Sequence, residues 1–245
     1  MKQLIEFFKT FLSKTKESKH GSTAIEDQKI IEEFASNPDN TFLISFPRTG
    51  SHWLRMIMEL YFKRPSLVRI FYFPENNNYL TLHTHDLELN VEHPKVIYLY
   101  RDPVDTIYSQ LNYHQEYTGN QQRISHWSDL YGRHLDKWLH KERFSQQKTI
   151  ITYEGMKKDL INEFRKVTNH FSHSLDVELL SQIAKQISKK EVKNKNLHDK
   201  NVIKLKSSYN TIRSEFRKQY GNLIWQVLTK EREHLFNYFE KAKMS

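Results

Sequence analysis

The stretch Ser45-Phe46-Pro47-Arg48-Thr49-Gly50-Ser51-His52-Trp53-Leu54 lies where a buried strand is expected to end and a helix to begin. Residues 41–46 are apolar and are bounded by Asn37-Pro38-Asp39-Asn40 before and Pro47 after, which is typical of a buried strand. From Ser51 onward the apolar residues follow helical spacing. A strand, a tight turn and a helix in close succession predict the opening unit of a parallel sheet.

The turn at residues 47–51 has the features of an anion-binding loop. The backbone N–H groups at the start of a helix are unpaired, and the helix dipole favours negative charge there. Gly50 allows a close approach of the chain, Thr49 and Ser51 add hydroxyl donors, and Arg48 adds positive charge. Such a loop cradles a phosphate or a sulfate ester. The alternative without function is a capped turn in an α/β fold.

The same succession of strand, turn and helix occurs again further along the chain. Residues 95–100 form a second apolar strand, followed by Arg101-Asp102-Pro103 and a helical pattern, and residues 148–152 form a third strand after an amphipathic helix at 122–143. A short helix is predicted at 30–34, and two more at 176–190 and 229–242, with a connection rich in lysine and asparagine between the last two. We therefore predict a three-layer α/β domain with a mainly parallel sheet and a ligand at the carboxyl ends of its strands.

Length and composition limit the classes of protein. The 245 residues suit one α/β domain at 27–245, preceded by an amphipathic helix and lead-in at 1–26. Cysteine is absent, which excludes disulfides, thiolate zinc sites and cysteine nucleophiles and fits a cytoplasmic location. No apolar run reaches the roughly 20 residues of a membrane-spanning helix. The apolar stripe of residues 1–20 either rests on a membrane surface or packs on the domain.

The net charge of +9 is concentrated in two lysine-rich segments, 1–20 and 185–206. Such a surface attracts nucleic acid, acidic lipid, acidic polysaccharide or a multiply phosphorylated nucleotide, and charge alone does not choose among them. The loop at 47–51 lacks the second glycine and the lysine of the GxxxxGK[ST] motif. A phosphoryl-transfer enzyme with a degenerate loop and a basic module that binds polyanions or membranes remain the rival interpretations.

On these residues the chain resembles the sulfotransferases that use 3'-phosphoadenosine 5'-phosphosulfate (PAPS). Residues 46–54 are similar to the family's 5'-phosphosulfate loop, usually written YPKSGTTWL. Residues 95–110, KVIYLYRDPVDTIYSQ, are similar to its 3'-phosphate segment, in which an arginine and a serine eight residues later hold the phosphate. The resemblance extends over residues 41–242 and implies the sulfotransferase fold. The nucleotide-binding residues that it implies are Pro47, Arg48, Thr49, Gly50, Ser51, His52, Trp53, Arg101, Ser109, Tyr153, Ser188, Arg217 and Lys218.

The outer parts of this set come from weaker similarities. Tyr153 begins YEGMKKD, which resembles the family's YEDMKKD, and the resemblance puts it beside the adenine with Trp53 and with Ser188 of Ile187-Ser188-Lys189. Either aromatic side chain could instead belong to the core. The family's RKGxxGDWK is only partly matched at residues 217–225, where Arg217 and Lys218 are the expected ligands. Gly221 is a weaker candidate there, and Arg213, one turn earlier, is a possible substitute.

His85 falls where the family carries the histidine that removes the acceptor proton. An unperturbed imidazole pKa of about 6.5 suits that role. A metal site made by His83, His85 and Asp86 is a competing interpretation, but no third histidine or carboxylate follows at helical spacing, and we expect no metal. A solvated loop histidine is the remaining alternative.

The chain departs from the family pattern at three places. Arg48 replaces a lysine, His52 replaces a threonine, and the Leu-Pro that commonly follows the histidine is absent. Arg48 can neutralise negative charge on the bridging oxygen but is a poor proton donor. The sequence therefore predicts sulfuryl transfer from PAPS to an acceptor hydroxyl or amine, with His85 and Arg48 as catalytic residues. The resemblance also implies that loops bind the acceptor, here at 69–78 and 113–119, and we expect the acceptor to be a small molecule, carbohydrate or lipid rather than nucleic acid.

Overall fold

The computed structural model describes residues 22–25, 27–196 and 209–239. Its centre is a five-stranded sheet in the order β3-β5-β2-β6-β7, in which every pair is parallel. The strands are β2 (Thr41–Ser45), β3 (Ser66–Leu67), β5 (Thr81–Thr84), β6 (Lys95–Tyr100) and β7 (Gln147–Thr152). A separate antiparallel pair joins β1 (Thr23–Ala24) to β4 (Arg69–Ile70). The predicted parallel α/β architecture is confirmed.

Both faces of the sheet are buried, which explains the continuous apolar runs of its central strands. In β2, Phe42 and Ile44 belong to one core and Leu43, between them, belongs to the other. In β6 the alternation continues, with Tyr98 in the first core and Leu99 in the second. Helices therefore cover the sheet on two sides.

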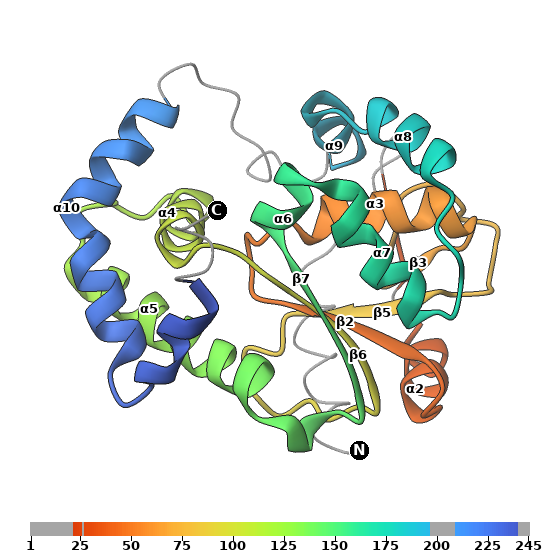
Figure 1. The fold of residues 1–245 in the computed structure, drawn as a ribbon, viewed down its shortest axis with the longest axis horizontal. Coiled ribbons are helices and arrows are strands. Elements are labelled where there is room, and N and C mark those ends of the chain that lie inside the picture. Colours follow the sequence, from red (N-terminus) through yellow and green to blue (C-terminus); the bar gives the residue numbers. More distant parts are fainter. Residues whose placement is uncertain (1–21, 26, 197–208, 240–245) are drawn as a thin grey trace.

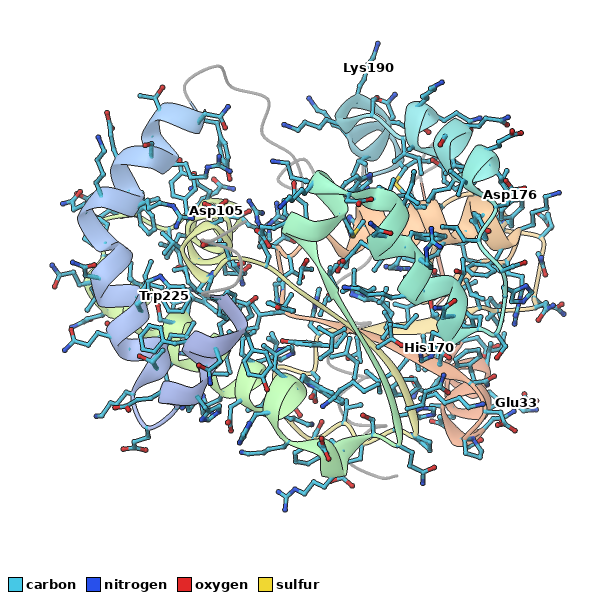
Figure 2. The ribbon with its side chains drawn as sticks, in the orientation of Figure 1. Glu33, Asp105, His170, Asp176, Lys190 and Trp225 are labelled. Atoms are coloured by element: carbon cyan, nitrogen blue, oxygen red, sulfur yellow. The ribbon has the colours of Figure 1, made fainter. Side chains whose placement is uncertain are left out.

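The helices form two groups, and in Figure 1 the second lies at the upper right and the first at the left and bottom, with α2 (Gln28–Ser36) at the lower right. The first core is shared by α2 (Gln28–Ser36), α4 (Pro103–Tyr113), α5 (Gln121–Leu135), the π-helical segment η1 (Asp136–His140) and α10 (Tyr209–Thr229). The second core is shared by α3 (Ser51–Phe62), α6 (Tyr153–Lys158), α7 (Leu160–His170), α8 (Val177–Gln186) and α9 (Lys189–Lys195). Trp225 on α10 and His170 on α7 mark the two groups in Figure 2.

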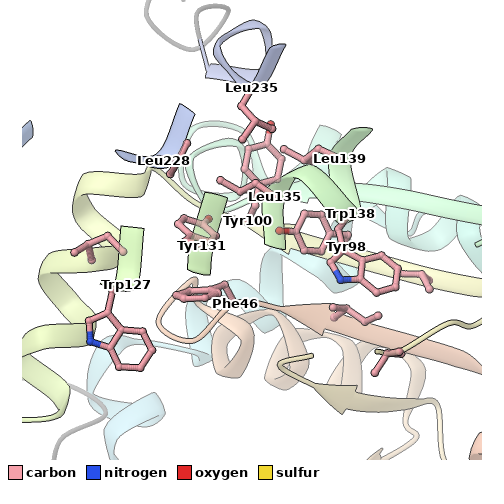
Figure 3. Close-up of a cluster of buried hydrophobic side chains, with 14 of the residues drawn as sticks. Phe46, Tyr98, Tyr100, Trp127, Tyr131, Leu135, Trp138, Leu139, Leu228 and Leu235 are labelled. Atoms are coloured by element: carbon pink, nitrogen blue, oxygen red, sulfur yellow. The ribbon is translucent and has the colours of Figure 1, made fainter. Parts of the chain in front are cut away.

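Aromatic side chains dominate the first core (Figure 3). Phe46, just after β2, packs against Tyr131 of α5 with ring centroids 4.5 Å apart, and Tyr98 of β6 stacks on Trp138 of η1 at 6.1 Å. All four side chains are fully buried. Ring burial on this scale contributes much of the area that holds helices to a sheet, and it fixes η1 against β6.

The parallel register brings the functional segments to one edge. Ser45, the last residue of β2, pairs with Leu99, and Ile44 pairs with Thr84, the last residue of β5. Tyr100 at the end of β6 pairs with Thr152 at the end of β7. The loops that carry Arg48, His85, Arg101 and Tyr153 therefore all leave the sheet at its carboxyl edge, where open parallel sheets bind ligands.

Several sequence predictions of helices were wrong. The segment assigned to a connection contains α10, and the helix predicted at 229–242 is replaced, in its described part, by the end of α10 at Thr229, the 3-10 turn η3 (Glu233–Phe236) and a helical turn at 237–239. The α-helix predicted at 122–143 ends at Leu135 and continues as η1 before the 3-10 turn η2 (Glu142–Phe144). Helix α7 was not predicted. The N-terminal helix predicted within residues 1–20 lies outside the described residues.

No helix in the described part of the chain is long and apolar enough to cross a membrane.

Candidate active site

The loop between β2 and α3 leaves the start of α3 open. Gly50 is the N-cap residue with φ +99°, and no side chain of the described residues caps α3, so the first N–H groups of this helix lack the usual partner. Arg48 has φ +71°. A Cβ at position 50 would lie 2.6 Å from the ring of Tyr153, so glycine is required both by the conformation and by the close approach. The arrangement is that of an anion-binding helix terminus.

The hydroxyl of Thr49, a predicted ligand, is bonded within the loop itself. It is buried and donates a 2.7 Å hydrogen bond to the carbonyl of Phe46, across the turn. The bond holds the loop in shape and directs the hydroxyl back to the strand. Ser51, His52 and Trp53 form the first turn of α3, directly after Gly50.

The two predicted phosphate segments meet at Arg48. Its Nε donates to Ser109 Oγ of α4 at 3.2 Å, and its backbone carbonyl accepts from Arg101 Nη1 at 3.2 Å. The Arg48 guanidinium also lies 4.8 Å from the ring centroid of Tyr113. Residues 48, 101 and 109, separated in sequence, are therefore assembled into one cationic cluster.

Arg101 is buried between this cluster and an aromatic pair. Its guanidinium lies over the ring of Tyr153 at 4.5 Å, and Tyr153 meets Trp53 edge-on at 5.9 Å. Arg101 is 9% exposed, and its Nε has no hydrogen-bond partner among the described residues. A buried N–H without a partner is costly, and an anion at this place would satisfy it.

Helix α10 adds two further arginines through the carboxylates of α4. Asp105 Oδ2 accepts from both Arg101 Nη2 and Arg213 Nη1 at 3.2 Å. Arg217 Nη2 donates to Asp102 Oδ1 at 2.6 Å and to Asp105 Oδ1 at 2.8 Å. Burial would raise the pKa of Asp105, but these guanidinium groups, Arg101 first, hold it below its usual range. Asp105, labelled on α4 in Figure 2, thus gathers three arginines at the carboxyl edge.

Two predicted ligands lie outside this cluster. Lys218 is exposed on α10 beside Arg217. Ser188 is exposed at the N-cap of α9, where its hydroxyl accepts from the N–H of Glu191 at 3.2 Å. Within the described ranges, neither makes a hydrogen bond to another predicted site residue.

His85 follows β5 and is half-buried beside the end of β2. Its Nδ1 is 2.7 Å from the carbonyl of Ser45, and its ring is perpendicular to that of His83, with centroids 4.7 Å apart. His83 Nε2 bonds to Ser45 Oγ at 3.1 Å. Burial lowers the pKa of His85 to about 4; the Ser45 hydrogen bond opposes this shift, and the charges of Arg55 and Arg48 add to it. His85 is therefore a neutral imidazole.

Two buried charged residues of α3, Arg55 and Glu59, were not predicted from the sequence. Arg55 is 1% exposed, its Nη1 lies 3.5 Å from His83 Nδ1, and its Nη2 donates to the carbonyl of Arg69. Glu59, one turn later, accepts from the backbone N–H groups of Ser66, Phe71 and Tyr72. The available signal was an Arg and a Glu four residues apart within the apolar run of α3.

In the described part of the chain, no three histidine, aspartate or glutamate side chains are arranged to hold a metal ion. His83 and Asp86, the proposed partners of His85 in a metal site, have protein partners instead: Ser45 and Arg55 bond to His83, and Lys137 and Trp138 bond to Asp86.

Comparison with known proteins extends these observations. Residues 77–245 match the family model described as the sulfotransferase domain, which is more than half of the chain. The chain belongs to the sulfotransferase family. The resemblance inferred from the two phosphate segments is confirmed, although the matched range begins after the loop at 45–54.

The sulfotransferase relatives are distant. Luciferin sulfotransferase of Photinus pyralis is 30% identical over 112 residues, 41% of this chain and 30% of that protein. Amine sulfotransferase of Oryctolagus cuniculus is 24% identical over 211 residues, 68% of each chain. The match thus spans about a third of the first relative and about two thirds of the second.

Solved structures share the sulfotransferase fold. Mouse sulfotransferase SULT7A1 complexed with PAP superposes with a TM-score of 0.57 at 15% identity, covering 89% of this chain and 93% of that chain. Retinol dehydratase in complex with androsterone and inactive cofactor PAP gives a TM-score of 0.52 at 13% identity, covering 82% and 83%. At these identities the likeness concerns the fold.

Proposed function

We propose that the protein transfers a sulfuryl group from PAPS to the hydroxyl or amine of an acceptor, with His85 as general base. The observation that carries the proposal is the contact between His85 Nδ1 and the Ser45 carbonyl oxygen. A carbonyl oxygen only accepts, so the 2.7 Å contact with Ser45 requires the proton on Nδ1 and leaves the Nε2 lone pair available. The base lies at the same sheet edge as the uncapped start of α3.

Two features of the chain fit a nucleotide with separate 5' and 3' anionic groups. The open helix start at Gly50 suits the 5'-phosphosulfate, as in other phosphate loops. The unpartnered Nε of Arg101 suits the 3'-phosphate. Asp105 bonds to both Arg101 and Arg217, and Arg48 bonds to Ser109, so these residues lie close to one another. Trp53 and Tyr153 would border the adenine, where base stacking contributes about 1–3 kcal/mol.

The protein's part in the reaction is positioning and charge. When bound, PAPS would supply the sulfuryl group, which passes to the acceptor oxygen or nitrogen as the phosphate departs. His85 Nε2 would receive the acceptor proton. Arg48, held by Ser109 and the Tyr113 ring, would neutralise charge on the departing phosphate but not donate a proton to it. As in phosphoryl transfer, orientation and electrostatics would supply most of the rate.

The relatives guide the choice of acceptors to test. Two are named for luciferin and for amines, and retinol dehydratase structures contain androsterone or retinol. We therefore propose a small-molecule acceptor and suggest these classes, with phenols and sugars, for an assay with radiolabelled PAPS.

Calorimetry with 3'-phosphoadenosine 5'-phosphate, ATP with Mg²⁺ and adenosine 5'-phosphosulfate tests the nucleotide proposal directly. We expect micromolar-order affinity for the first and much weaker binding of the others, because charged donors are left unpaired without a 3'-phosphate. Equal affinity for the first and third would contradict the assignment of Arg101, and preferential binding of ATP with Mg²⁺ would support phosphoryl transfer instead.

A further inference from the structure

Asp86, the residue after His85, carries a fully buried carboxylate. Its Oδ2 accepts from Lys137 Nζ at 2.8 Å and from Trp138 Nε1 at 2.9 Å, and its Oδ1 accepts from the backbone N–H of Val91 at 2.9 Å. The side chains of Asp86 and Lys137 are 0% and 4% exposed. Three donors thus fix one side chain directly beside the proposed base.

The same ammonium group also holds the far end of this loop. Lys137 Nζ donates to the carbonyl of Val91 at 2.6 Å, while the N–H of Leu89 donates to the carbonyl of Asp86 at 3.1 Å. Asp86 has φ +43°, a left-handed conformation that aspartate tolerates better than most residues. Lys137 therefore closes the turn at residues 86–91 from both ends.

Two consecutive residues of the π-helical segment η1 reach the same carboxylate. Lys137 and Trp138 both lie in η1 and both donate to Asp86 Oδ2. Trp138 is further fixed by stacking on Tyr98 in the first core.

His85 is tied to the same scaffold through its backbone. The carbonyl of His85 accepts from His134 Nε2 at 2.9 Å, and His134 Nδ1 accepts from the hydroxyl of Tyr98 at 2.9 Å. The His85 ring is held from the other side by Ser45. A change in the loop would therefore be transmitted to the ring, and a misplacement of about 1 Å can lower a rate about 100-fold.

A buried ion pair is weak evidence for stability, because desolvation offsets most of the attraction. Its presence next to the base calls for another role. The residues that follow His85, from Asp86 to Asn90, include no proline to restrict φ in this turn. Asp86 is fixed by side-chain bonds instead.

We propose that Asp86 and Lys137 are positioning residues, which hold the loop after β5 so that His85 Nε2 faces the acceptor. The inference rests on the proposed function of His85 as the base. Neither residue touches the reactants; both act through the backbone of His85.

The test requires variants that leave no orphan charge in the interior. Lys137→Met alone strands the Asp86 carboxylate and risks misfolding. The double substitution Asp86→Asn with Lys137→Met removes both charges and the bonds that Lys137 donates to Asp86 and Val91, and asparagine tolerates the left-handed conformation at position 86. Lys141→Met is the matched control, because Lys141 pairs with Asp136 of the same segment at 2.6 Å but its side chain is 46% exposed.

For the double variant we expect affinity for 3'-phosphoadenosine 5'-phosphate within about twofold of wild type and turnover lower by about 10- to 100-fold at saturating acceptor. In NMR titrations the His85 imidazole should move toward its ordinary pKa near 6.5 as the loop becomes solvated. Lys141→Met should match wild type in all three. A folded double variant with normal turnover and an unchanged His85 titration would overturn the proposal.

Amide hydrogen exchange in the wild-type protein gives a test that needs no variant. The Val91 N–H, bonded to Asp86 Oδ1, should be strongly protected, and rapid exchange there would also overturn the proposal. These readouts distinguish failure of the proposed function from failure of the positioning role of Asp86 and Lys137. If no acceptor is sulfated, the proposed function fails, whereas the His85 titration and the Val91 exchange still decide whether the ion pair fixes the loop.

Discussion

His85 Nδ1 lies 2.7 Å from the carbonyl oxygen of Ser45, the last residue of β2. The contact assigns the proton to Nδ1 and leaves Nε2 as an acceptor. Burial lowers the pKa of His85 to about 4, so the imidazole is neutral and able to accept a proton throughout the ordinary pH range. The positive charges of Arg55 and Arg48 also disfavour the imidazolium form of His85, and a neutral base is therefore compatible with its position beside these arginines.

Substitution of His85 tests its role as base. His85→Ala should bind 3'-phosphoadenosine 5'-phosphate almost normally but lose about 100- to 10,000-fold in turnover, because only proton removal fails. His83→Ala should lower turnover only mildly, because His83 Nε2 is already bonded to Ser45 Oγ. Turnover that persists in His85→Ala would point to His52 or to an acceptor amine that needs no base.

The pH dependence of wild-type turnover offers a separate prediction. The base must be neutral, and its pKa is lowered to about 4, so turnover should stay nearly constant as the pH falls from 8 to about 5 and decline near 4. The profile should be measured at saturating substrates. An acidic limb centred near 6.5 would show that the active imidazole is solvated and is not this buried one.

The sheet edge could be predicted from sequence because its signals are local. The apolar runs of β2 and β6, each followed by a turn and a helical pattern, indicate parallel strands, and parallel strands bring their carboxyl ends together. The convergence of Arg48 and Arg101 follows from that rule. The strand before His85, β5, was not predicted, and His85 was identified through the family resemblance.

Helix α10 could not be predicted because its support is distant. Its buried residues are widely spaced among charged ones, and the partners of Arg213 and Arg217 are Asp102 and Asp105, more than 100 positions earlier in the chain. The buried charges Arg55 and Asp86 were missed for the same reason. A charged side chain looks like surface until the structure supplies its partner.

Basic residues at the carboxyl edge of the sheet and on α10 lead to a prediction about nucleotide affinity. Arg101→Ala should weaken binding of 3'-phosphoadenosine 5'-phosphate by on the order of 2–5 kcal/mol, because its contact is buried. Arg213→Ala should cost more than Lys218→Ala, because Arg213 reaches Asp105 and Lys218 is exposed. Calorimetry on the three variants decides the order, and a larger loss in Lys218→Ala would restore the family's pattern.

Two glycine-to-alanine substitutions should change stability in opposite directions. A Cβ on Gly132 would lie 2.5 Å from the carbonyl oxygen of Leu228, so Gly132→Ala should separate α5 from α10 and cost about 1–3 kcal/mol. A Cβ on Gly221 would have its nearest neighbours at 4.0 Å, so Gly221→Ala should stabilise α10 by about 0.5–1 kcal/mol. Urea unfolding measures both, and a shared sign would contradict the packing at one of them.

Buried neutral histidines should make the protein sensitive to mild acid. His170 of α7, remote from the active site, bonds to Thr41 Oγ1 at 3.1 Å and to Thr149 Oγ1 at 2.9 Å. Burial, aided by the charge of Lys95, lowers its pKa to about 4. In the unfolded chain the value is about 6.5, so between these two pH values the unfolded state binds more protons than the folded state.

The free energy of unfolding should therefore be fully retained above pH 6.5 and should fall as the pH decreases toward 4, by up to about 1.4 kcal/mol per pH unit for each such histidine.

His170→Gln keeps a polar partner for the two threonines but cannot titrate. The unfolding free energy of the His170→Gln variant should fall less steeply than that of wild type between pH 6.5 and 4, by up to about 1.4 kcal/mol per pH unit. Nucleotide affinity at neutral pH should be unchanged. Carboxylates whose pKa is lowered, such as Asp105, lose their contribution only at lower pH and do not mimic this difference. Urea unfolding of both proteins at several pH values between 4 and 7 measures the slopes, and identical slopes would show that His170 is already protonated in the folded protein.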